Sequence, residues 1–238
     1  MILQGLYRYP LKSGAAQSSE QVRLDPLGLQ GDRSWVLTDP QGRFVTARDY
    51  PQLSMVHTQG SRFFFVDSLS PVAQVDALGD VSIWKREQPA KRAADDINAW
   101  FSQIVHAPVV LWHLSGQDAQ HFGDSNPVMV LFQSTVDAMS QALGEEFPAL
   151  QFRPNLLLSG APAFSEGTQD TLQVGQVTLK AIEPCTRCKM INLPPESDHY
   201  PMPMRVAPAL RRLSPDFVAG HHYQVMQSGS LALGDACS

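Results

Sequence analysis

Frequent proline and glycine residues divide this sequence into short apolar runs, and this pattern limits the fold more than any other feature. The 238 residues include 18 prolines and 16 glycines. Both residue types favour turns and interrupt helices, so the runs between them have the length of β-strands. The sequence therefore predicts many short strands and few helices. Its length allows one large domain or two small ones with a real core.

The composition excludes several classes of protein. Hydrophobic residues make up 43% and charged residues 17%, which is typical of a soluble globular protein. The net charge of -5 gives no electrostatic reason to expect a nucleic acid or an anionic membrane as partner. No apolar run approaches the roughly 18 residues of a membrane span, and the N-terminus lacks the pattern of a secretory signal. Three cysteines are too few for a disulfide scaffold, which favours free thiols and a cytoplasmic location.

The order of the apolar runs predicts three parts of the chain. The first part contains predicted strands at 3–9, 21–24, 34–37 and 44–48. The middle part contains predicted strands at 54–58, 62–67, 72–76 and 81–84, with turns at Gly60 and Gly79, followed by an amphipathic helix at 93–105 and a strand at 109–112. The third part contains predicted strands at 128–132 and 156–159, a helix at 134–143 and a hairpin at 173–182. The proline-rich segment 192–217 is expected to be irregular, and loops of this length are usually functional or mobile.

Two of the three cysteines, Cys185 and Cys188, lie between the apolar runs 177–182 and 190–191. We expect a loop at the end of a strand to carry both cysteines. The sequence leaves several functions for their thiols open. A structural zinc site needs four ligands, and a thioredoxin-like dithiol needs a helix N-terminus, so the spacing favours neither. A single thiolate could bind a soft metal or act as a nucleophile, helped by Arg187 and Lys189. Two inert buried thiols are the remaining alternative.

Several cations and hydroxyl groups fall at the ends of predicted strands. They are Lys12, Ser13, Arg33, Arg48, Arg153, Thr186 and Arg187. Arginine offers a rigid fork of donors that matches phosphate or carboxylate, so these residues could together hold a phosphorylated cofactor or an anionic substrate. The alternative for each arginine is an exposed position or a pair with a nearby aspartate. The doublet His221 and His222 is expected on the surface of a strand rather than in a metal site, because no third ligand is suitably spaced.

Six short motifs, in this order along the chain, resemble the MOSC family, which is named after the C-terminal domain of molybdenum cofactor sulfurase. The motifs are at residues 9–13, 28–35, 45–48, 124–127, 152–155 and 185–188. Each motif is modest alone, but the resemblance spans nearly the whole chain. Members of the family include the mitochondrial amidoxime-reducing component and bacterial proteins that reduce N-hydroxylated bases.

The resemblance implies an α+β fold that is mainly β. Residues 1–36 and 109–238 would form the MOSC β-barrel domain, and residues 37–108 would form an inserted α/β region. It also implies a molybdenum cofactor of the molybdopterin type, with Cys188 as the metal ligand and catalytic residue. The family motifs match further cofactor-binding positions that contact the phosphate, the pterin or the same pocket, namely Lys12, Ser13, Arg33, Asp124, Arg153, Asn155 and Thr186.

The same resemblance implies an oxidoreductase that reduces N-hydroxylated compounds. Many bacterial relatives continue into a ferredoxin-like domain with four more cysteines, whereas this sequence ends at Ser238 with only Cys237 left. The expected partners are therefore a small-molecule substrate and an external electron-donor protein of the ferredoxin, flavin or haem type. Two alternatives are a non-catalytic carrier of cofactor or persulfide sulfur, with pyridoxal phosphate as a further candidate ligand, and a structural barrel that has lost its chemistry.

Overall fold

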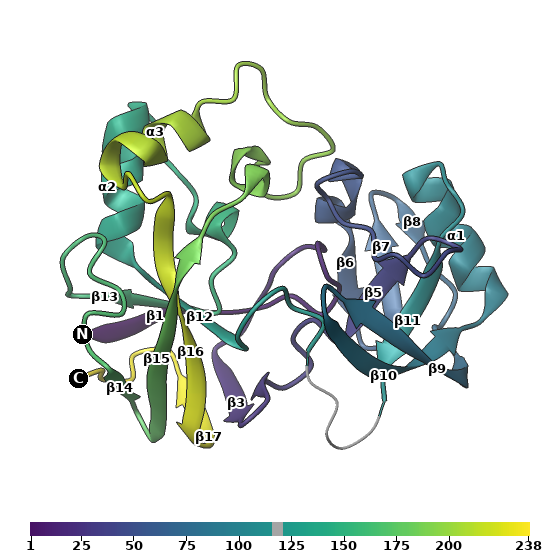
Figure 1. The fold of residues 1–238 in the computed structure, drawn as a ribbon, viewed down its shortest axis with the longest axis horizontal. Helices are drawn as coiled ribbons and strands as arrows, with labels where there is room; N and C mark the ends of the chain where they lie inside the picture. The colour runs from purple at the N-terminus through teal and green to yellow at the C-terminus, as the bar shows by residue number, and fades with distance from the viewer. Residues whose placement is uncertain (116–120) are drawn as a thin grey trace.

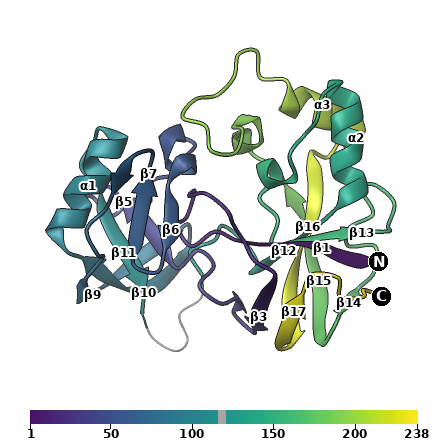
Figure 2. The same ribbon diagram turned by 180° about the vertical axis from the view of Figure 1, so that it is seen from behind.

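The computed structural model describes residues 1–115 and 121–238. The fold is α+β and mainly β, as predicted, because the described residues form many short strands and few helices. Two lobes lie side by side, as Figure 1 and Figure 2 show from opposite sides. The large lobe holds both chain ends. The small lobe holds the strands that lie between residues 35 and 114. None of the helices in the described residues is long and apolar enough to span a membrane.

The large lobe is built on a sheet that joins the first and last parts of the chain. Its strand order is β14-β15-β16-β12-β13-β1-β2. The bounds are β1 (Ile2–Arg8), β2 (Gln17–Ser18), β12 (Val128–Phe132), β13 (Leu156–Ser159), β14 (Thr171–Val174), β15 (Val177–Thr186) and β16 (Val218–Gln227). A second sheet pairs β3 (Gln21–Asp25) with β4 (Gly28–Leu29) and with β17 (Gly229–Ala232).

Long-range pairing fixes the N-terminus inside this lobe. Strand β1 runs antiparallel to β13, with Ile2 opposite Ser159. The Met1 ammonium group donates a hydrogen bond to the Cys237 carbonyl at 2.9 Å. Strands β12 and β13 are parallel, and α2 (Gln133–Leu143) lies between them in sequence, as a parallel pair requires a crossover connection. The first residues of the chain thus complete a sheet formed mainly by its second half.

The small lobe contains two sheets and one helix. The larger sheet has the order β5-β11-β10-β9. The bounds are β5 (Trp35–Thr38), β6 (His57–Gln59), β7 (Arg62–Phe65), β8 (Ser68–Leu69), β9 (Val75–Ile83), β10 (Arg86–Ala93), β11 (Val110–Leu114), α1 (Asp95–Val105) and the 3₁₀ turn η1 (Pro51–Met55). Helix α1 confirms the predicted amphipathic helix, and it buries Ile97, Phe101 and Ile104. The domain boundaries at 36/37 and 108/109 stay a prediction.

Several of the sequence-based predictions for the small lobe are wrong. Gly79 was expected in a turn, but it lies inside β9 and faces Trp112, where a Cβ atom would come within 2.9 Å of the indole ring. The chain turns instead at Trp84 and Lys85, between the paired residues Ile83 and Arg86. The predicted strand at 44–48 is irregular, with one isolated bridge from Phe44. Strand β10 was not predicted at all, because Pro89 interrupts its pattern.

The proline-rich segment leaves the large lobe and returns to it. After η3 (Lys189–Asn192), residues 193–205, here called the strap, run irregularly to α3 (Val206–Leu213). Helix α3 was not predicted within 192–217, but proline in the first turn of a helix loses no helical hydrogen bond, so Pro208 is tolerated there. Figure 1 shows the strap in yellow-green, reaching from α3 toward the small lobe.

The strap is fixed to the small lobe by polar and apolar contacts. The Ser54 hydroxyl donates to the Ser197 carbonyl at 2.6 Å, and the Ser197 amide donates to the Ser54 hydroxyl at 3.2 Å. The Tyr200 hydroxyl donates to the Ala47 carbonyl at 3.1 Å. Leu193 is buried in the apolar core of the small lobe. The strap therefore connects the two lobes beside the loop that carries Cys188.

Candidate functional site

A cavity of about 220 Å³ collects residues from both ends of the chain. All eight predicted site residues line it, although more than 170 positions separate the first from the last. They are Lys12, Ser13, Arg33, Asp124, Arg153, Asn155, Thr186 and Cys188. The large lobe supplies most of the wall, and Thr46 and Arg48 come from the loop that follows β5. The cavity is therefore the candidate functional site.

The two cysteines of the 185–188 motif lie in different environments. Strand β15 ends at Thr186, so Cys188 follows it in a loop, as the apolar runs predicted. The Cys188 thiol is exposed and free, whereas the Cys185 thiol is buried and accepts a hydrogen bond from Arg187 Nη1 at 2.7 Å. Arg187 Nη2 also donates to the Phe152 carbonyl at 2.6 Å. Cys188 is thus the thiol that a ligand can reach, and Cys185 supports the loop.

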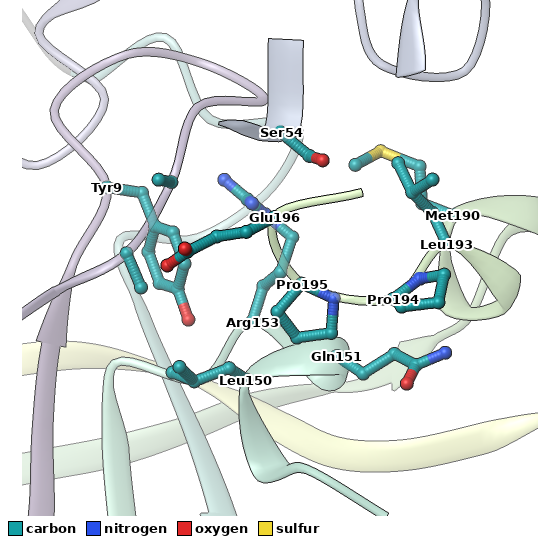
Figure 3. A pocket seen from close by; sticks show the side chains of 12 residues that line it. Tyr9, Ser54, Leu150, Gln151, Arg153, Met190, Leu193, Pro194, Pro195 and Glu196 are labelled. Carbon is teal, nitrogen blue, oxygen red and sulfur yellow. The ribbon is translucent and has the colours of Figure 1, made fainter. Parts of the chain in front are cut away.

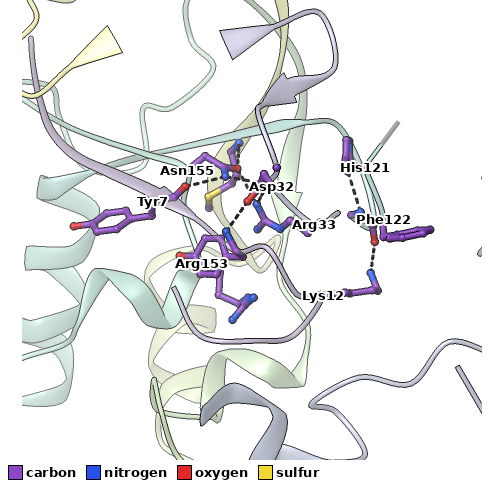
Figure 4. Close-up of polar contacts among 12 residues, drawn as sticks. Tyr7, Lys12, Asp32, Arg33, His121, Phe122, Arg153 and Asn155 are labelled. Atoms are coloured by element: carbon purple, nitrogen blue, oxygen red, sulfur yellow. Dashed lines mark hydrogen bonds and ion pairs between the residues drawn. The ribbon is translucent and has the colours of Figure 1, made fainter. Parts of the chain in front are cut away.

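Lys12 and Asp124 form a polar group at one side of the cavity. The buried Lys12 ammonium donates to the Phe122 carbonyl at 2.9 Å, shown in Figure 4, and pairs with the Asp124 carboxylate. Arg48 Nη2 lies 3.3 Å from the same carboxylate, and Trp84 Nε1 donates to it at 3.2 Å. Burial lowers the pKa of Lys12 to about 8, although Asp124 acts in the opposite direction. Lys12 is therefore still positively charged at neutral pH. Because burial disfavours that charge, a neighbouring anion stabilises it.

Asn155 and Asp32 form a second group, also shown in Figure 4. The Asn155 amide donates to the Tyr7 carbonyl and to Asp32, both at 3.2 Å, and its oxygen accepts from Met129 N and from Arg33 Nη1. Both amide protons and the oxygen are therefore engaged within the protein. The Asn155 side chain positions Arg33 rather than offering free donors to a ligand. Asp32 was not predicted as a site residue, because an aspartate beside an arginine is common on surfaces.

Ser13 and Thr186 contribute the hydroxyl groups of the cavity. Ser13 lies in a tight turn in which the Gly14 amide donates to the Leu11 carbonyl at 2.8 Å. The Ser13 φ of 71° is uncommon for a residue other than glycine. Thr186 is the last residue of β15. The two hydroxyl groups thus reach the cavity from a turn and from a strand end, as expected of residues that follow strands.

Two histidines in the cavity were not predicted as site residues. His222 lies in β16, as expected, but it lines the cavity, and His221 beside it is buried, so the prediction of a surface position is wrong for both. Burial, together with Arg187 and against Glu183, lowers the pKa of His222 to about 4. Its buried Nδ1 atom has no hydrogen-bond partner among the described residues. Burial lowers the pKa of His121 to about 3, so both imidazoles are neutral at pH 7.

The charges that line the cavity do not balance. Five cations face two carboxylates, namely Lys12, Arg33, Arg48, Arg153 and Arg187 against Asp32 and Asp124. An excess of positive charge with free donors is the arrangement that binds phosphate groups. Among the described residues, no cluster of histidine, cysteine and acidic side chains could hold a metal ion by itself. Cys188 is the exposed one of the three free cysteines, and a thiolate is a soft metal ligand.

Comparison with known proteins agrees with this organisation. The chain is 25% identical to mitochondrial amidoxime-reducing component 1 of Danio rerio, over 98% of this chain and 83% of that protein. It is 24% identical to molybdenum cofactor sulfurase of Oryza sativa subsp. japonica, over 82% of this chain and 28% of that protein. The fold is similar to that of the YUAD protein from Bacillus subtilis, with a TM-score of 0.53 at 11% identity, over 99% of this chain and 93% of the other.

Two family descriptions together cover almost the whole sequence. Residues 1–108 match the MOSC N-terminal beta barrel domain. Residues 117–238, which include Asp124, Arg153 and Cys188, match the MOSC domain. The chain therefore belongs to the MOSC family, as the six sequence motifs indicated.

Proposed function

We propose that this protein binds a molybdenum cofactor and reduces N-hydroxylated compounds such as amidoximes and hydroxylated bases. The observation that carries the proposal is the exposed Cys188 thiol beside a cavity with an excess of cations. Amidoxime-reducing components match this chain over almost its whole length, which supports a reductase. Free cysteines also fit a reducing compartment, and we propose the cytoplasm.

The residues present fit such a cofactor. Thiolates are soft ligands that suit transition metals, so Cys188 would hold the molybdenum. Lys12, Arg33 and Arg153 would bind the phosphate, and the hydroxyl groups of Ser13 and Thr186 would bind the phosphate or the pterin. Asp124 keeps Lys12 and Arg48 oriented toward the cavity. The unpaired Nδ1 of His222 would gain a hydrogen-bond partner.

When bound, the cofactor supplies two-electron chemistry at the metal, and the protein supplies binding and orientation. Reduction of an N-hydroxylated compound consumes two electrons and two protons and yields the amine and water. The protein offers no second redox group among its described residues, so a separate electron-donor protein would supply the electrons. Cys188 lines the cavity and is exposed, so a small substrate and solvent protons can reach it.

A carrier of persulfide sulfur is the second candidate function. An exposed free thiol favours it, because a sulfur donor can reach such a thiol. The match to molybdenum cofactor sulfurase supports it as well. Pyridoxal phosphate has less support, because Lys12 is engaged by Phe122 and Asp124 rather than free to form a Schiff base.

Metal analysis of protein made in a host that synthesises the cofactor tests the proposal. We expect molybdenum at about one atom per chain in the wild type and in Cys185→Ala, and none in Cys188→Ala. Wild-type protein without molybdenum from a cofactor-rich host would refute it. A persulfide on Cys188, seen by mass spectrometry in place of the metal, would support the carrier. Loaded protein is then assayed on a benzamidoxime with added flavin and haem reductases.

A further inference from the structure

One buried aromatic ring behind the wall of the cavity contacts two of the arginines that line it. The Arg33 guanidinium carbon lies 4.5 Å from the centre of the Tyr9 ring, and that of Arg153 lies 4.2 Å from it. Tyr9 is 1% exposed, so the ring is fixed by its surroundings. Figure 3 shows Tyr9 and Arg153 together in the wall of a second, smaller cavity. Nothing in the sequence singled out Tyr9 beyond its place in the first motif.

The backbone of Tyr9 is also held by the segment that carries Arg33. The Tyr9 amide donates to the Asp32 carboxylate at 2.7 Å, and the Arg33 amide donates to the Tyr9 carbonyl at 2.8 Å. Asp32 pairs with Arg33 as well. Any displacement of Arg33 would therefore break contacts with Tyr9. Tyr9, Asp32 and Arg33 are thus held together by direct contacts between each pair.

Two guanidinium groups in one buried wall repel each other. Burial lowers the pKa of Arg153 to about 10, which still leaves it charged at neutral pH. A cation is attracted to the face of an aromatic ring, so the shared ring offsets part of the repulsion. Arg153 Nη1 donates to the Gly14 carbonyl at 2.8 Å, and Arg33 Nη1 contacts Asp32 and Asn155. Within residues 1–115 and 121–238, the remaining N–H groups of both arginines have no hydrogen-bond partner and can bind a ligand.

The Tyr9 hydroxyl has a separate environment. It is buried without a hydrogen-bond partner among the described residues. The smaller cavity beside it has a volume of about 30 Å³ and is also lined by Ser54 and Gln151. That volume suits one water molecule, which the hydroxyl can bind. The ring and the hydroxyl therefore have different roles, and a variant can separate them.

We propose that Tyr9 is a positioning residue for phosphate binding: its ring holds the guanidinium groups of Arg33 and Arg153 so that both bind one phosphate group. The ligand class is a phosphate monoester or diphosphate with two or more negative charges. A planar π-face suits this role, because it attracts both cations without neutralising either. The inference rests on the proposed function only in naming the cofactor as the source of that phosphate.

Arginine side-chain NMR of the protein prepared without cofactor tests the inference. The Hε signals of Arg33 and Arg153, assigned with the Arg33→Lys and Arg153→Lys variants, are followed while pyrophosphate is added. We expect ring-shifted signals in the wild type and in Tyr9→Phe, and both signals to move with one half-saturation concentration. In Tyr9→Leu the ring shifts should disappear, and pyrophosphate should bind about tenfold more weakly.

Three results would overturn the inference. The first is unchanged pyrophosphate affinity in a folded Tyr9→Leu protein. The second is movement of one arginine signal without the other in the wild type, a result that holds even if Tyr9→Leu does not fold. A loss of affinity in Tyr9→Phe as large as in Tyr9→Leu would assign the role to the hydroxyl and also contradict the inference. Phosphate binding that depends on Tyr9 in a protein that never contains molybdenum would refute only the proposed function.

Discussion

Cys185 and Cys188 show how much a shift of three residues changes the chemistry of a side chain. Cys185 lies on β15 and is buried against Arg187, so its thiol is part of the packing. Cys188 lies beyond the end of the strand and stays exposed. Strand residues alternate between the two faces of a sheet, and that rule stops where the strand stops. The position of the strand end, rather than the residue type, decides which thiol a ligand can reach.

His222 gives a prediction at this scale. Burial and the charge of Arg187 lower its pKa from 6.5 to about 4. Between these values the unfolded chain binds a proton that the folded protein does not, so the free energy of unfolding falls as the pH falls. Between pH 7 and pH 5, we expect the free energy of unfolding of His222→Gln to fall by about 2 kcal/mol less than that of the wild type. Urea unfolding at both pH values measures this difference.

The matched control for this experiment is His106→Asn, an exposed position outside the cavity. It should follow the wild-type pH dependence, because asparagine also tolerates the left-handed backbone at residue 106. Equal pH dependence in His222→Gln and the wild type would contradict the buried, neutral imidazole.

Sequence patterns predicted the residues of the cavity better than their roles. Five of the six motifs bring the eight predicted residues to one place, because these motifs lie beside strands whose ends meet. Asn155 shows the limit of such matching, since its amide is used within the protein. Tyr9, Asp32 and His222 were missed, because their roles depend on contacts across more than a hundred residues or on which face of a strand they occupy.

At the level of elements, local rules failed where tertiary contacts decided the structure. Glycine is typical of turns, yet Gly79 lies within a strand and packs closely against the Trp112 ring. Pro89 argues against a strand, yet β10 contains it. Helices α1 and α2 were predicted close to their observed bounds, because an apolar face repeats every turn in both. Periodicity over three turns is thus the more reliable local signal in this chain.

The strap is the element whose attachment can be tested most directly. Its reciprocal hydrogen bonds with Ser54 join residues that are 143 positions apart. Loss of both bonds should lower the free energy of local opening of the strap by about 1 to 2 kcal/mol. The free energy of global unfolding should change less. We expect Ser54→Ala to exchange the amide protons of residues 193–200 about tenfold faster, as measured by hydrogen exchange with mass spectrometry.

Ser61→Ala is the control, since Ser61 is exposed and its hydroxyl makes no hydrogen bond to any residue that the structure describes. Exchange in 193–200 that is the same in Ser54→Ala and Ser61→Ala would show that the strap is held by other contacts. The apolar contact of Leu193 would then be the next position to vary.

At the scale of the whole molecule, the large lobe depends on the first residues of the chain. The buried side chains of Leu3, Leu6, Val22, Leu24 and Leu29 belong to the same core as those of β12, β13 and β16. Five such side chains contribute about 1.5 to 3 kcal/mol each, which matches the roughly 5 to 15 kcal/mol stability of a typical domain. Sequence patterns cannot show this dependence, because strand pairing across the chain leaves no local signal.

A fragment experiment tests both this dependence and the proposed division of the chain. Fragment 109–238 lacks β1 and β3, so β13 keeps only β12 as a partner and β17 loses its pairing with β3. We expect it to show no cooperative unfolding in urea when followed by circular dichroism. An equimolar peptide of residues 1–36 should restore a cooperative transition, whereas the same peptide with Leu3→Ser and Leu6→Ser should not. Cooperative unfolding of the fragment alone would mean that the second half of the chain holds a sufficient core, and that the N-terminal strands serve mainly to bring Lys12 and Arg33 to the cavity.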